Sequence, residues 1–68
     1  MNYFEWSQEY SAEADKINKV ITTLTVKCKK ASRSEKKLLE ARIRDYRQCY
    51  RECVEISDLL LQRHRGVA

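Results

Sequence analysis

Apolar and small residues recur at alternating steps of four and three along the chain, and this repeat most limits what the chain can fold into. In the first half the row is broken only by Ser7 and consists of Tyr3, Ser7, Tyr10, Ala14, Ile17, Ile21, Leu24, Cys28 and Ala31. In the second half it consists of Leu39, Ile43, Tyr46, Tyr50, Cys53, Ser57, Leu60 and His64. A four-three repeat is typical of amphipathic helices that pack along a seam. The sequence therefore predicts an all-α fold.

The repeat is interrupted at residues 32–35, where Ser32-Arg33-Ser34-Glu35 matches the Ser-x-x-Glu capping box that starts a helix. Three lysines just before it suit the negative C-terminal end of a helix dipole: Lys27, Lys29 and Lys30. Since a stop signal and a start signal coincide here, we predict a two-helix antiparallel hairpin in one domain, residues 1–68. The alternative is one continuous helix that runs through this corner.

The helix ends have their own signals. Asn2 can cap the first helix, which is expected to cover residues 3–30. The second is expected to cover residues 33–63 and to fray after Arg63, with Gly66 as the stop. Folding the halves about the corner gives a seam in which large residues meet smaller ones. Its predicted pairs are Leu24–Leu39, Ile21–Ile43, Ile17–Tyr46, Ala14–Tyr50, Tyr10–Cys53 and Tyr3–Leu60.

More apolar residues flank the seam than one neighbouring helix can cover, and they are the candidate interface: Phe4, Trp6, Val20, Cys49, Val54, Ile56 and Leu61. A chain of 68 residues also has little core of its own. We therefore expect self-association, as a homodimeric four-helix bundle, or burial against a helical protein partner. The other interpretation is that some of these residues lean into the hairpin groove, since single exposed apolar residues are common.

Charge is unevenly distributed along the chain. Residues 1–15 contain four acidic and no basic residues, whereas residues 27–37 contain six basic residues and only Glu35 as an acid. The basic corner and its continuation supply candidate nucleic-acid contacts: Lys29, Lys30, Arg33, Lys36, Lys37 and Arg44. No aromatic residue interleaves them, so stacking on single-stranded bases is not indicated. A small nucleic-acid-binding regulator is thus the alternative function; otherwise these lysines complement a helix end on a solvated face.

The residues that could carry chemistry do not form a site. Cys49 and Cys53 lie one helical turn apart, but a closed zinc site needs four ligands, so we expect them to act as small buried hydrophobes. His64 is the single histidine and has no nucleophile near it in the sequence. We therefore predict a protein that is not an enzyme, with no catalytic residues, metal, cofactor or small-molecule substrate.

Cysteine number and hydropathy bear on location. Three cysteines without a secretory segment are typical of a reducing cytoplasm. The longest purely apolar run is residues 59–61, far below the roughly 20 residues that span a bilayer. We expect a cytoplasmic protein with free thiols and no membrane partner.

Two short stretches carry a resemblance. The Asn2-Tyr3-Phe4-Glu5-Trp6 start and Leu39-Glu40-Ala41-Arg42-Ile43 are similar to small proteins carried on bacterial phages and mobile elements. In length, helix number and small-large alternation, the chain also resembles short bacterial helical-hairpin regulators and chaperones, including the Rop-like regulators, which are antiparallel homodimers that bind RNA. The resemblance implies a bacterial helical hairpin, and no activity. The leading hypothesis is a non-enzymatic helical interaction module.

Overall fold

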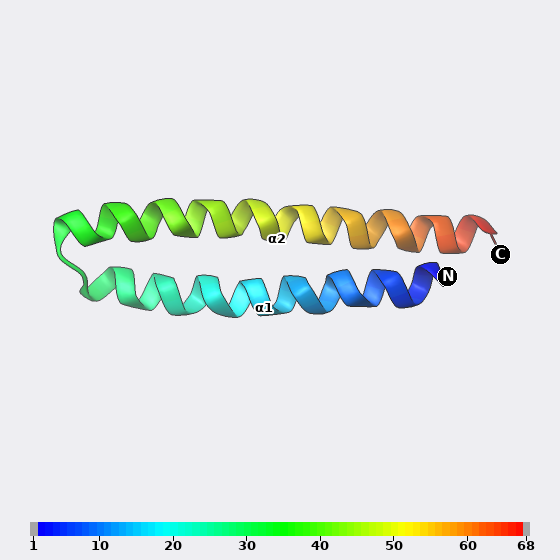
Figure 1. Cartoon of the computed structure of the whole chain (residues 1–68), viewed down its shortest axis with the longest axis horizontal. Coiled ribbons are helices and arrows are strands. Elements are labelled where there is room, and N and C mark those ends of the chain that lie inside the picture. Colours follow the sequence, from blue (N-terminus) through cyan, green and yellow to red (C-terminus); the bar gives the residue numbers. More distant parts are fainter. Residues whose placement is uncertain (1, 68) are drawn as a thin grey trace.

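The computed structural model describes residues 2–67, with side chains for residues 2–66. Helix α1 (Tyr3–Lys30) and helix α2 (Arg33–Val67) lie side by side and antiparallel, with both chain ends at the same end of a rod (Figure 1). The rod measures 53 × 14 × 14 Å. No strand occurs within residues 2–67. The predicted all-α hairpin is confirmed, and the alternative of one continuous helix is wrong.

Three of the helix boundaries follow from local capping. Asn2 Oδ1 accepts a hydrogen bond from the backbone N–H of Phe4 at 2.9 Å, which starts α1. Helix α1 ends at Lys30, because Ala31 is extended and its N–H turns back to the carbonyl of Cys28 at 3.3 Å. Ser32 Oγ then accepts from the N–H of Glu35 at 3.4 Å and caps α2. The predicted ends at residues 3, 30 and 33 are confirmed.

The predicted end of the second helix at Arg63 is wrong, because α2 continues through Gly66 to Val67. Gly66 has no positive φ and so does not act as a left-handed stop. A glycine inside a helix costs only about 0.5–1 kcal/mol relative to alanine. This cost is too small to end a helix whose last turns pack against a neighbouring helix. The last turns of α2 also contact α1, since the rings of His64 and Phe4 are 5.8 Å apart.

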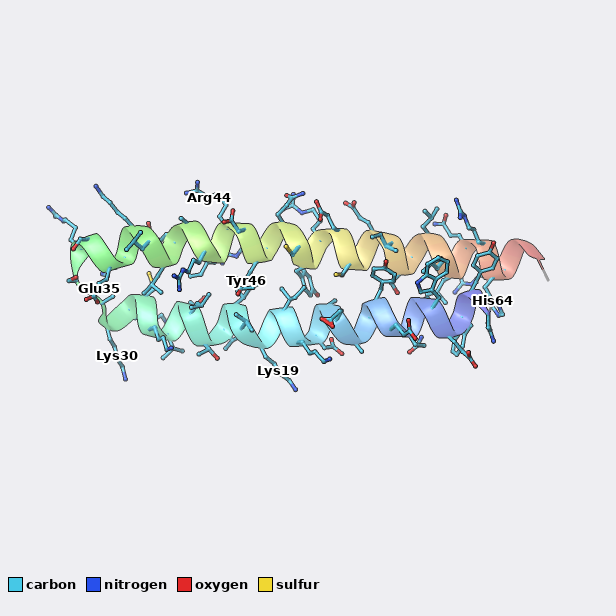
Figure 2. All side chains as sticks on the ribbon, viewed as in Figure 1. Lys19, Lys30, Glu35, Arg44, Tyr46 and His64 are labelled. Carbon is cyan, nitrogen blue, oxygen red and sulfur yellow. The ribbon has the colours of Figure 1, made fainter. Side chains whose placement is uncertain are left out.

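The predicted seam faces inward, but it is thin. Among the described residues the buried apolar side chains are those of Ala14, Ile43 and Leu60. Tyr46 lies between the helices (Figure 2), yet its side chain and that of Tyr50 remain 38% and 37% exposed. Two helices leave a groove too shallow for a tyrosine ring. The hairpin alone thus covers the centre of its seam and not the edges.

Ser7, the residue that breaks the heptad row, is the most buried of the residues whose side chains are described. Ser7 is 0% exposed, and Ser57 Oγ donates a hydrogen bond to the Ser7 backbone carbonyl at 3.0 Å across the seam. The Ser7 hydroxyl in turn donates to the carbonyl of Phe4 at 2.7 Å. Two short side chains let the helices approach closely, and the hydrogen bond fixes their register here. This contact lies between the predicted pairs Tyr10–Cys53 and Tyr3–Leu60.

Replacing Ser7 with leucine would complete the heptad row, yet we expect it to destabilise the fold. No space exists for the larger side chain, and overpacking a filled core costs about 1–3 kcal/mol. Urea unfolding followed by circular dichroism, at one fixed protein concentration, measures the change. Ser11→Leu, one turn later on an exposed position, is the matched control and should change stability little. A Ser7→Leu chain as stable as the wild type would show that the helices separate here without cost.

Candidate functional site

Each helix has two flanks, which face opposite sides of the hairpin. Successive residues of an α-helix are rotated by about 100°, so the residue just before an inward-facing one lies on one flank. The residue just after an inward-facing one lies on the other flank. The position of a residue relative to the seam therefore determines which side of the hairpin it occupies.

Four candidate interface residues share one side. Val20 and Cys49 line a single hollow, of about 370 Å³, with Tyr46 between them. Ile56 lies two turns after Cys49 on the same flank of α2, and Trp6 lies four turns before Val20 on the same flank of α1. All four are exposed, with Trp6 at 36%, Ile56 at 37% and Val20 at 39%. We call Trp6, Val20, Cys49 and Ile56 the apolar face.

The other three candidates lie on the opposite flank, near the open end of the rod. Phe4, Val54 and Leu61 each directly follow a seam residue. Val54 and Leu61 are half-buried, and Phe4 is exposed but contacts the His64 ring. We call these three the distal patch. The seven residues predicted as one interface thus divide between two sides of the hairpin.

One exposed apolar residue was missed by the sequence reasoning. Val26 is 50% exposed and lies two turns after Lys19, which points away from α2 (Figure 2). Its spacing from Lys19 is the signal that places it on the outer surface. Leu38 and Leu59 are also largely exposed, at 70% and 47%. Val26 lies outside both the apolar face and the distal patch, whereas Leu38 and Leu59 each directly precede a seam residue and so lie on the same side of the hairpin as the apolar face.

The side of the hairpin opposite the apolar face carries a basic groove of about 660 Å³. Its lining residues are Thr25, Cys28, Lys29, Lys36, Glu40, Ile43, Arg44, Arg47, Gln48 and Arg51. Five of them are cationic, and Glu40 is the one carboxylate in the lining. Both helices contribute, since Lys29 belongs to α1 and the other four cations belong to α2.

The groove contains half of the predicted nucleic-acid contacts and adds others. Lys29, Lys36 and Arg44 line it, whereas Lys30, Arg33 and Lys37 are exposed but do not. Lys30 points away from α2 (Figure 2). Arg47 and Arg51 complete the cationic lining. Arg51 was missed because it is distant from the corner in sequence, although two turns from Arg44 put it on the same flank.

The three thiols are free and lie in different surroundings. Cys49 is exposed, Cys53 is half-buried, and Cys28 lines the basic groove. Burial raises the pKa of the Cys53 thiol above its ordinary value, and the negative charges of Glu13, then of Cys49 and Glu52, raise it further. No group of three or more potential metal ligands occurs among the described residues.

A comparison of the chain with protein-family models, with curated proteins and with solved structures found no match. Neither α1 nor α2, over the residues described, has the length and apolarity needed to cross a membrane.

We expect Cys53 to react more slowly than Cys49 with iodoacetamide near pH 8. The thiolate is the reacting form, and a raised pKa leaves less of it at a given pH. Alkylation rates of the Cys49→Ser and Cys53→Ser chains, both with Cys28→Ser, measure each thiol alone. The rate at Cys53 should reach half its maximum at a higher pH in the folded chain than in urea. In urea the two rates should converge; equal rates in the folded chains would contradict the assigned surroundings.

Proposed function

We propose that this chain is a non-enzymatic helical interaction module that self-associates through its apolar face, so that two hairpins form a four-helix bundle. The observation that carries the proposal is the large solvent-accessible surface area of the chain. The chain exposes 5602 Å². A compact monomer of 8.1 kDa would expose about 4,500 Å², so the excess is about 1,100 Å². A standard interface buries about 800 Å² on each partner, which this excess can supply.

The thin core supports the same proposal. Ala14, Ile43 and Leu60 are the buried apolar side chains of the described residues. Burying a side chain of leucine size contributes about 1.5–3 kcal/mol, so two such residues and one alanine offset little of the entropy lost when two long helices are ordered. A second hairpin packed on Trp6 and Ile56 would cover side chains that are now more than a third exposed. Association would thus stabilise the fold as well as create a complex.

The opposite side is less suited to a second copy. Two hairpins facing each other across the basic groove would bring five cations of one chain against five of the other. Like charges brought together in a partly desolvated interface repel one another strongly. The side that carries the apolar face has both signs, because its central hollow is lined by Arg42 and Asp45 and glutamates surround Trp6. Self-association is therefore assigned to the apolar face.

Charge at the two ends of the rod favours an antiparallel arrangement of the hairpins. The open end carries the acidic residues 5–15 of α1, and the corner carries the basic residues 27–37. In a parallel pair, one basic corner would lie over the other. In an antiparallel pair, each acidic end would lie over a basic corner. A second copy is thus complementary to the chain itself, which favours it over an unrelated partner helix.

We expect Ile56→Glu to convert the dimer into a monomer. A carboxylate buried in the apolar face without a partner costs about 3–5 kcal/mol, so Kd should rise at least about 100-fold. Sedimentation equilibrium at micromolar concentration measures the change in mass.

Val26→Glu is the matched control, because it makes the same kind of substitution at an exposed apolar residue on the outer surface. It should leave the mass unchanged. A wild-type chain that is monomeric at micromolar concentration, and that loses no helix on further dilution, would contradict the proposal.

The antiparallel arrangement makes a separate prediction for cross-linking. Glu9→Cys lies near the open end of the apolar side and Lys27→Cys lies near its corner end; in both chains the native cysteines are replaced by serine. When the two chains are mixed and treated with a short bismaleimide, we expect the mixed Glu9→Cys/Lys27→Cys product to dominate. Mass spectrometry identifies the linked pair. Products that join Lys27→Cys to itself would show a parallel pair instead.

A further inference from the structure

We propose that the basic groove binds the sugar-phosphate backbone of double-stranded nucleic acid, independently of its sequence. The groove lies on the side of the hairpin opposite the apolar face, so this site is separate from the one that self-association would use.

The first support is the number and sign of the groove's charges. Lys29, Lys36, Arg44, Arg47 and Arg51 face a lining that contains a single carboxylate, Glu40. Along α2 the lining extends from Lys36 to Arg51, a length of about 22 Å at the usual rise of a helix. A strand of a duplex carries a phosphate about every 3.4 Å of its axis, so the groove can follow several consecutive phosphates.

The second support is that the groove cations form no ion pair with any of the residues that the structure describes. The one ion pair among the described side chains joins Lys16 to Glu13 at 3.7 Å, well away from the groove. Arg and Lys side chains without carboxylate partners contact an incoming phosphate without first breaking a salt bridge. Three of the five are arginines, whose planar guanidinium groups match a phosphate with two parallel hydrogen bonds.

The third support is that the groove suits a duplex better than a single strand. No aromatic side chain lines the groove, so it has no platform on which single-stranded bases could stack. The neutral polar groups are already engaged: the Thr25 hydroxyl donates to the Ile21 carbonyl at 2.7 Å, and Gln48 Nε2 donates to Glu52 Oε1 at 3.2 Å. Recognition therefore rests on charge. A duplex holds its phosphates at fixed spacing and matches such a rigid row of cations without being ordered first.

A charge-matched pair of variants tests the groove. Arg47→Gln/Arg51→Gln removes two groove cations, and Lys19→Gln/Lys30→Gln removes two that point away from α2 (Figure 2). Both lower the net charge from +4 to +2. Circular dichroism checks that both remain helical. Binding to a labelled duplex of about 20 base pairs, as DNA and as RNA, is followed by fluorescence anisotropy between about 50 and 200 mM salt.

We expect the wild-type chain to bind both duplexes, with a slope of log K against log salt of about −4.5 for about five neutralised phosphates. The groove variant should bind at least about tenfold more weakly, and its slope should be smaller by about 2. The outward-facing variant should stay within about twofold of the wild type, because its two lysines do not line the groove.

Several results would overturn the proposal. Equal losses in the two double variants would show that net charge, and not the groove, attracts the duplex. An absence of binding at 50 mM salt, or tighter binding of the corresponding single strand, would exclude a duplex site. Displacement by polyglutamate as effective as by unlabelled duplex would show that the groove accepts an acidic protein segment instead. None of these results would affect self-association, which Ile56→Glu tests separately.

Discussion

Two helices that pack side by side can bury only the stripe that each turns toward the other. In this hairpin the stripe hides Ala14, Ile43 and Leu60, and it leaves the seam tyrosines Tyr46 and Tyr50 more than a third exposed. Because the seam has no second layer, the flanks of both helices remain on the surface. A rod of two helices has more residues on its flanks than in its core. The side chains on those flanks therefore determine what the hairpin can bind.

The hydrogen bond between Ser57 and Ser7 fixes how these flanks are divided. At Ser7 and Ser57 the seam is narrow enough for a hydroxyl on α2 to donate to a backbone carbonyl on α1. With Ser57 held inward, Ile56 must face one side and the residues that follow seam positions must face the other. A rotation of α2 by one residue would mix the apolar face with the groove arginines. The serine contact thus keeps two chemically different sides apart.

Features set by neighbouring residues could be predicted from the sequence, whereas those set by distant contacts could not. The ends at Tyr3, Lys30 and Arg33 follow from caps that lie within four residues of each boundary. The burial of Ser7 depends on Ser57, 50 residues away, and a heptad count records Ser7 only as a break. The sequence selects only three of the five groove cations for a related reason. Charge counted along the sequence selects the corner, but charge on one flank selects Arg47 and Arg51.

The two proposed sites also constrain each other. Hairpins joined through their apolar faces would turn their basic grooves outward, on opposite surfaces of the bundle. This separates ten cations into two sets of five, so association would not have to overcome their mutual repulsion. One straight duplex could then contact only one groove of a dimer, and a dimer would hold two duplexes or two segments of a bent one. Dimerisation would thus add a second binding site without changing the first, and would link duplex segments that a single hairpin cannot join.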